Sequence, residues 1–166
     1  YNREKIKLYT NSETSTFLLN RFDYLFNRNK NSQSYFEPPL ELINIDYYQN
    51  LMINDISVHT IKQHHGVIDT LGFIINNTFA YCTDVVSFPK KSLECLYNLN
   101  TIIITGLRST PHTAHAHFDL TFKWIADLKP RIAYLTHLSP ESDHDTVTKL
   151  CPSGVYPAYD GLVINI

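Results

Sequence analysis

The second half of the chain alternates short apolar runs with amphipathic stretches, a pattern that few folds accommodate. Residues 101–105 and 132–135 are apolar without polar alternation, which predicts strands buried on both faces. Residues 89–99 and 118–128 have helical periodicity, and the second of these ends before Pro130. A strand, helix, strand, helix, strand order predicts an α/β layer architecture.

The remaining elements follow from turn and capping signals. Asn11 or Ser12 is suited to cap a helix. Asn76-Asn77 predicts a hairpin turn between apolar residues 71–75 and 79–82, because Asn tolerates positive φ. The other predicted segments are strands at 5–9, 53–60, 155–159 and 162–166, a loop at 27–39 and a short helix at 143–151.

Composition excludes several classes of protein. The chain has 166 residues, 43% of them hydrophobic and 18% charged, which suits one globular domain over residues 1–166 without an internal linker. Its net charge of −2 and lack of a basic run argue against a nucleic-acid partner. No apolar stretch approaches the roughly 20 residues of a membrane helix. Three widely spaced cysteines without a CxxC pair fit a reducing, cytoplasmic location.

Three predicted strands end in residues that can bind a metal. His137 follows the strand at 132–136, Asp84 follows residues 79–83, and His65 stands beside Gly66. Imidazole nitrogen and carboxylate oxygen together suit zinc, manganese or iron. Taken singly, each residue has an ordinary structural use: a histidine can be hydrogen-bonded, and an aspartate can cap a helix or a turn. The pattern alone leaves both interpretations open.

Longer motifs resemble a known family. Thr136-His137-Leu138-Ser139 and Tyr159-Asp160-Gly161 resemble the C-terminal signature of metallo-β-lactamase-superfamily hydrolases. The subgroup containing the phosphodiesterase of the carbon–phosphorus lyase pathway is the nearest match. Its middle motifs are similar to Gln63-His64-His65-Gly66 and to the run from Ala80 to Asp84. The match runs in one order over nearly the whole chain.

The resemblance implies a fold and a metal centre. The fold would be α/β, the C-terminal part of an αββα metallo-β-lactamase sandwich. His65 would bind the first of two divalent metal ions, zinc or manganese, His137 the second, and Asp84 both. A hydroxide held between the metals would hydrolyse a small-molecule substrate, a phosphodiester. His115 would be catalytic and would protonate the leaving oxygen.

Three further residues gain roles from the same resemblance. Arg108 and His112 belong to a loop similar to the family's "LR…PHxxH" segment, beside the substrate. Arg108 would hold a phosphate or form an ordinary ion pair. Asp143 would either support a ligating histidine or cap a helix.

One family motif is absent. HxHxDH, which supplies ligands to both metals, does not occur, and we expect it before Tyr1 in a longer protein, since the sole methionine is Met52. His115-Ala-His117-Phe-Asp119 reads HxHxD, but Leu120 replaces the final histidine. His112, His115 and His117 could instead form an adventitious metal cluster. We expect metal binding by this truncated chain alone to be weak or absent.

Three functions remain open on these grounds. The first is a metal-dependent hydrolase, the second a catalytically inactive fragment of one, and the third a non-enzymatic α/β interaction module. A partial sandwich would expose an apolar sheet face. We therefore also predict a homo-oligomer, or a partner that covers this face.

Overall fold

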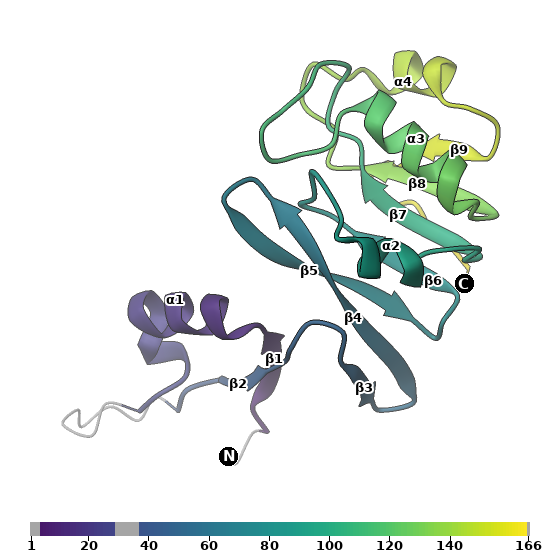
Figure 1. The fold of residues 1–166 in the computed structure, drawn as a ribbon. Coiled ribbons are helices and arrows are strands. Elements are labelled where there is room, and N and C mark those ends of the chain that lie inside the picture. Colours follow the sequence, from purple (N-terminus) through teal and green to yellow (C-terminus); the bar gives the residue numbers. More distant parts are fainter. Residues whose placement is uncertain (1–3, 29–36, 166) are drawn as a thin grey trace. The chain divides into compact units, whose positions relative to one another are not determined.

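The computed structural model describes residues 4–28 and 37–165, and its contacts divide the chain into two compact units, Tyr1–Tyr47 and Tyr48–Ile166 (Figure 1). Each unit is described by itself. The prediction of a single domain over residues 1–166 stays a prediction. Most of the predicted loop at 27–39 lies outside the described residues.

The first unit pairs two strands with one helix. β1 (Ile6–Thr10) and β2 (Leu40–Asn44) form a parallel two-stranded sheet. α1 (Ser12–Phe22) begins after Asn11, whose side-chain oxygen accepts a 2.8 Å hydrogen bond from the Thr14 amide, so Asn11 rather than Ser12 is the cap. A short 3-10 helix, η1 (Asp23–Leu25), follows α1.

The second unit contains a seven-stranded sheet whose spatial order follows the chain. Neighbouring strands are antiparallel from β3 to β6 and parallel from β6 to β9. The strands are β3 (Asn50–Ile53), β4 (Ile56–His65), β5 (Ile68–Ile75), β6 (Phe79–Cys82), β7 (Thr101–Thr105), β8 (Ile132–Thr136) and β9 (Val155–Pro157).

Helices connect the parallel strands, because parallel neighbours need a crossover. α2 (Lys90–Cys95) lies between β6 and β7, α3 (Phe118–Leu128) between β7 and β8, and α4 (His144–Leu150) between β8 and β9 (Figure 1). The largest apolar side chains at the centre of the core are fully buried: Ile61, Leu96, Ile102, Ile104, Leu128 and Leu135. The predicted mixed α/β class and the buried strand at 101–105 are confirmed.

Strand direction sets where a site can form. β4 is antiparallel to β5, and β5 to β6, so β4 runs the same way as β6, β7 and β8. The carboxyl ends of these four strands therefore meet at one edge of the sheet. In α/β proteins, ligands bind beyond such strand ends.

The structure corrects three boundaries. The predicted strand at 53–60 belongs to a hairpin of β3 and β4, whose turn begins at Asn54 with φ 52°. The helix predicted at 89–99 ends at Cys95, and Asn98 has φ 56°, which no helix continues. Residues 162–165 form no strand. The hairpin turn at Asn76-Asn77 is confirmed, with φ 50° and 56°.

Within the described residues, no helix has both the length and the apolar character needed to cross a membrane.

Candidate metal centre

Four side chains that could bind a metal meet at the shared edge of the sheet. His65 is the last residue of β4, and Asp84 follows β6. His115 lies in the loop between β7 and α3, and His137 comes directly after β8. The structure thus brings together all three predicted metal ligands and the predicted catalytic histidine.

The distances suit a shared cation. His65 Nε2 and His115 Nε2 are 3.2 Å apart. Asp84 Oδ1 lies 3.8 Å from His65 Nε2, from His115 Nδ1 and from His137 Nε2. Ligand atoms bound at about 2 Å to one zinc ion lie roughly 3–4 Å from one another. The ligand atoms of His65, Asp84 and His115 all lie within 4.8 Å of one another and can hold one ion.

His137 completes the cluster through its ring. Its imidazole stacks on that of His115 with 4.5 Å between centroids, and the rings of His65 and His115 meet edge to face at the same distance. His65 Nδ1 and His115 Nδ1 are buried without a hydrogen-bond partner among the described residues. Buried polar atoms without partners are unfavourable, and a cation bound beside Asp84 would give His115 Nδ1, 3.8 Å from the Asp84 carboxylate, a partner.

Electrostatics favour neutral imidazole at His115. Burial lowers the pKa of its ring, and the nearby His137 and His65 lower it further, while Asp84 opposes them. A histidine must be neutral to bind a metal. His115 is therefore suited to coordinate an ion, whereas the predicted proton donation to a leaving oxygen needs the protonated ring, which this lowered pKa disfavours.

The backbone is left-handed where two of these side chains project. Asp84 has φ 55° and His137 has φ 61°. Residues other than glycine adopt this region at a cost, and such residues cluster at functional sites. Each left-handed turn ends a strand sharply and directs the side chain to the edge of the sheet.

The loop that carries His115 is held close by backbone hydrogen bonds. The Ala116 amide donates to the Val85 carbonyl at 2.7 Å, and the Leu107 amide donates to the Ala116 carbonyl at 2.9 Å. Gly66, with φ 65°, allows the loop to approach His65, since a Cβ there would lie 3.3 Å from the Ala114 Cβ.

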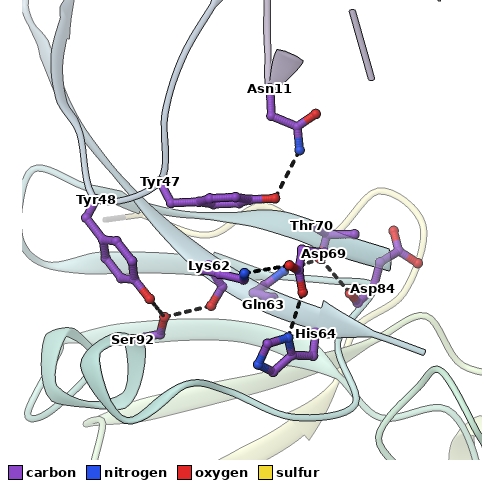
Figure 2. A network of polar contacts seen from close by, with 10 residues as sticks. All are labelled: Asn11, Tyr47, Tyr48, Lys62, Gln63, His64, Asp69, Thr70, Asp84 and Ser92. Atoms are coloured by element: carbon purple, nitrogen blue, oxygen red, sulfur yellow. Dashed lines mark hydrogen bonds and ion pairs between the residues drawn. The ribbon is translucent and has the colours of Figure 1, made fainter. Parts of the chain in front are cut away.

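A buried network behind Asp84 was not found by sequence reasoning (Figure 2). The side-chain amide of Gln63 donates to the Thr83 carbonyl at 2.8 Å and to the Thr70 hydroxyl at 3.2 Å, and this hydroxyl donates to the Asp84 carbonyl at 2.8 Å. Gly72 leaves room for Gln63, whose Oε1 would lie 2.6 Å from a Cβ there. One available signal was that Gln63 alternates with the apolar Ile61, which predicts an inward-facing amide.

The residues predicted to assist the site have different neighbours. The ring of His112 lies 5.1 Å from that of His115. Arg108 forms an ion pair with Glu141 at 3.4 Å, the ordinary alternative named for it. Asp143 caps α4 by accepting a 2.9 Å hydrogen bond from the Thr146 amide.

His64 and His117 stand apart from the cluster. His64 Nδ1 lies 2.6 Å from Asp69, which also pairs with Lys62 (Figure 2). The Lys62 and His64 hydrogen bonds lower the pKa of the Asp69 carboxyl. His117 is the residue before α3. Successive residues of a strand point to opposite faces, and these contacts agree with His64 pointing away from the face that carries His65.

Comparison with known proteins places this arrangement in a family. The sequence profile of the beta-lactamase superfamily domain matches residues 2–138, which include all four clustered residues. An octanoyltransferase of Porphyromonas gingivalis strain W83 is 24% identical over 160 residues. That match covers 95% of this chain and 32% of the octanoyltransferase, so the chain spans about a third of this curated relative.

Solved structures share the fold. A diphosphatase from the PhnP family is 26% identical with a TM-score of 0.84, over 96% of this chain and 57% of that one. The metallo-beta-lactamase fold protein YhfI of Bacillus subtilis is 16% identical with a TM-score of 0.74, over 96% of this chain and 64% of that one. Human tRNase Z, short form, has a TM-score of 0.66 at 12% identity, over 99% of this chain and 69% of that one. The chain belongs to the β-lactamase superfamily and has the metallo-β-lactamase fold.

Proposed function

We propose that this chain carries part of the metal centre of a hydrolase, and that the complete protein hydrolyses a phosphodiester. The observation that carries the proposal is the meeting of His65, Asp84, His115 and His137 at one edge of the sheet. The 26% identity to a diphosphatase supports chemistry at a phosphoryl group.

Each clustered residue has a role in the proposal. His65 and His137 would hold one divalent ion each, zinc or manganese, and Asp84 would be a ligand to both. Such ions supply Lewis acidity and lower the pKa of water. His115 either completes a ligand set with His65 or donates a proton to the leaving oxygen, and its position within 4 Å of Asp84 allows both.

The four clustered side chains are too few to hold two catalytic metal ions. Catalytic zinc usually has three protein ligands and an open position. Four side chains shared by two ions fall short of that number, so the proposal includes further ligands from outside the segment Tyr1–Ile166. Arg108 and His112 lie in the same loop as His115, and in the proposal they would contact the phosphoryl group.

The test is hydrolysis of bis(p-nitrophenyl) phosphate by the purified protein with zinc or manganese added. We expect metal-dependent turnover that falls by about 100-fold or more in His115→Ala, and that is lost in Asp84→Asn and His137→Ala. His144→Ala is the matched control, because His144 lies exposed on α4. Turnover that survives Asp84→Asn would refute the proposal.

Two other outcomes would support the two alternative functions, an inactive fragment or a non-enzymatic interaction module. Metal binding without turnover on this ester or on a diphosphate ester indicates an inactive fragment. No metal binding at all favours an interaction module, whose histidines are structural.

A further inference from the structure

A second group of reactive side chains lies far from the metal centre. His59 is on β4, six residues before His65, or about 20 Å along an extended strand. It faces Cys95, the last residue of α2, and Asn50 on β3. These residues line a cavity of about 330 Å³ together with the apolar side chains of Ile74, Tyr97 and Leu99.

Hydrogen bonding fixes which nitrogen of His59 is free to act as a base. His59 Nδ1 lies 2.7 Å from Asn50 Oδ1. An amide oxygen can only accept, so Nδ1 carries the hydrogen and the neutral ring has its lone pair at Nε2. Asn50 is directly opposite His59 in the β3–β4 register, so the sheet itself orients the ring.

The free nitrogen faces a thiol. His59 Nε2 lies 3.8 Å from Cys95 Sγ, which also lies 3.2 Å from the Lys91 carbonyl of its own helix. A nucleophile within reach of a base, with a third group orienting that base, is the arrangement that activates cysteine and serine in covalent catalysis.

The charge states suit a base and a neutral thiol. Burial lowers the pKa of His59, and Lys91 lowers it further. Burial raises the pKa of the Cys95 thiol, with Glu94 adding to this and Lys91 opposing it. Both shifts favour the neutral pair over a thiolate and an imidazolium, so the proton would pass from Sγ to His59 Nε2 only as the sulfur attacks an electrophile. The placement of Nε2 beside the thiol makes His59 the base in position to accept it.

We propose that Asn50, His59 and Cys95 form a nucleophilic thiol site, separate from the metal centre, that is modified covalently by small neutral electrophiles entering the cavity. In the reaction with iodoacetamide, His59 Nε2 takes the proton from Sγ, a sulfur–carbon bond forms, and iodide leaves as the carbon–iodine bond breaks. The apolar lining of Ile74 and Leu99 favours an uncharged electrophile over an anionic one.

The chain offers its own comparison thiols. Cys151 is also partly buried, and burial also raises its pKa, but no described residue hydrogen-bonds its sulfur. Cys82 is fully buried and reports on loss of structure. Alkylation of all three can be followed in one sample of the whole protein by peptide mass spectrometry.

We expect iodoacetamide to label Cys95 about 10-fold or more faster than Cys151, given the usual strength of general-base assistance. His59→Gln should bring the rate at Cys95 down to that at Cys151, and iodoacetate should show a smaller preference for Cys95 than iodoacetamide does. Asn50→Ala, which leaves His59 in place, should also lower the alkylation rate at Cys95.

Two results would overturn the proposal. One is a Cys95 rate no greater than that of Cys151. The other is a Cys95 rate that is unchanged in both variants while Cys82 stays protected. If Cys82 becomes labelled in His59→Gln, that variant has lost its structure. The rate at Cys95 in Asn50→Ala then tests the proposal.

Discussion

At the scale of single residues, Asp84 depends on side chains that never contact a metal. Its left-handed backbone costs on the order of 1–3 kcal/mol unless its surroundings hold it. The Thr70 hydroxyl binds the Asp84 carbonyl, and Gln63 binds both that hydroxyl and the Thr83 carbonyl (Figure 2). These bonds keep the carboxylate at the edge of the sheet.

Replacing Thr70 tests this support. Thr70→Val removes the donor to the Asp84 carbonyl, so we expect a loss of about 1–3 kcal/mol in unfolding free energy and weaker zinc binding. Thr70→Ser keeps the hydroxyl and should restore both. Chemical unfolding and a zinc titration measure the two effects.

Thr121→Val is the matched control for that experiment, because the Thr121 hydroxyl donates a similar 2.7 Å bond to the Thr105 carbonyl. Thr121→Val should lower the free energy of unfolding but leave zinc affinity at the wild-type value, whereas Thr70→Val should lower both. Zinc affinity that is unchanged in Thr70→Val would show that this bond does not position Asp84.

Gly66 makes a second residue-scale prediction. Gly66→Ala places a side chain at φ 65° and 3.3 Å from the Ala114 Cβ, so it should destabilise the fold by about 1–2 kcal/mol from the backbone alone and displace the loop that carries His115. Gly161→Ala also has a positive φ, but nothing lies within 4 Å of its Cβ. Thermal unfolding should show losses in both, and only Gly66→Ala should weaken zinc binding.

The candidate site could be predicted from sequence only where residues follow strands. His65, Asp84 and His137 each stand at or just after the end of a predicted strand, and parallel strand ends converge. The roles of Gln63 and Thr70 depend on the β4–β5 register, in which they are directly paired, and a single sequence does not state register. Asp143 was ambiguous for a similar reason, since capping and metal support both favour a carboxylate.

At the scale of elements, apolar runs predicted the buried strands well, whereas the turns were harder to predict from sequence. β7, β8 and α3 agree with their predicted positions because their periodicity is strong. The β3–β4 turn was missed, since Asn54-Asp55 interrupts a β-rich run without glycine or proline. Residues 162–165 have strand-like composition, but a strand also needs backbone pairing with a neighbour, which composition does not specify.

The cap of α4 makes an element-scale prediction with a defined pH dependence. Hydrogen bonds from the Thr146 amide and hydroxyl hold the pKa of the Asp143 carboxyl below its usual value near 3.8. A carboxyl whose folded pKa is depressed stabilises the fold above the unfolded pKa, and this contribution is lost as the pH falls through the folded pKa.

Asp143→Ala should therefore be less stable than wild type at pH 7, and the difference should shrink as the pH falls below about 4. Urea unfolding of both proteins across this range measures it. A difference that stays constant down to the acid limit would mean that the carboxylate charge does not contribute to the cap.

At the scale of the whole molecule, strand direction explains why one edge of the sheet holds the metal-binding side chains. β4, β6, β7 and β8 run in one direction and end together (Figure 1). The chain spans 57% of the diphosphatase chain that it resembles, so the activity of the complete protein rests on the proposal above.

Self-association is a prediction at this scale. Met52, Ile56 and Ile68 expose apolar side chains on the strands β3 to β5, and such surface favours association. We expect sedimentation velocity at micromolar concentrations to show a dimer or larger species. A single monomeric species over the whole concentration range would contradict this.

The central claim is that His65, Asp84, His115 and His137 form one metal-binding site. Calorimetric titration of the complete protein with zinc, alongside its Asp84→Asn and His144→Ala variants, tests it most directly. We expect saturable zinc binding that weakens by about 10-fold or more in Asp84→Asn and is unchanged in His144→Ala. Equal zinc affinity in wild type and Asp84→Asn, or no binding by either, would contradict the claim.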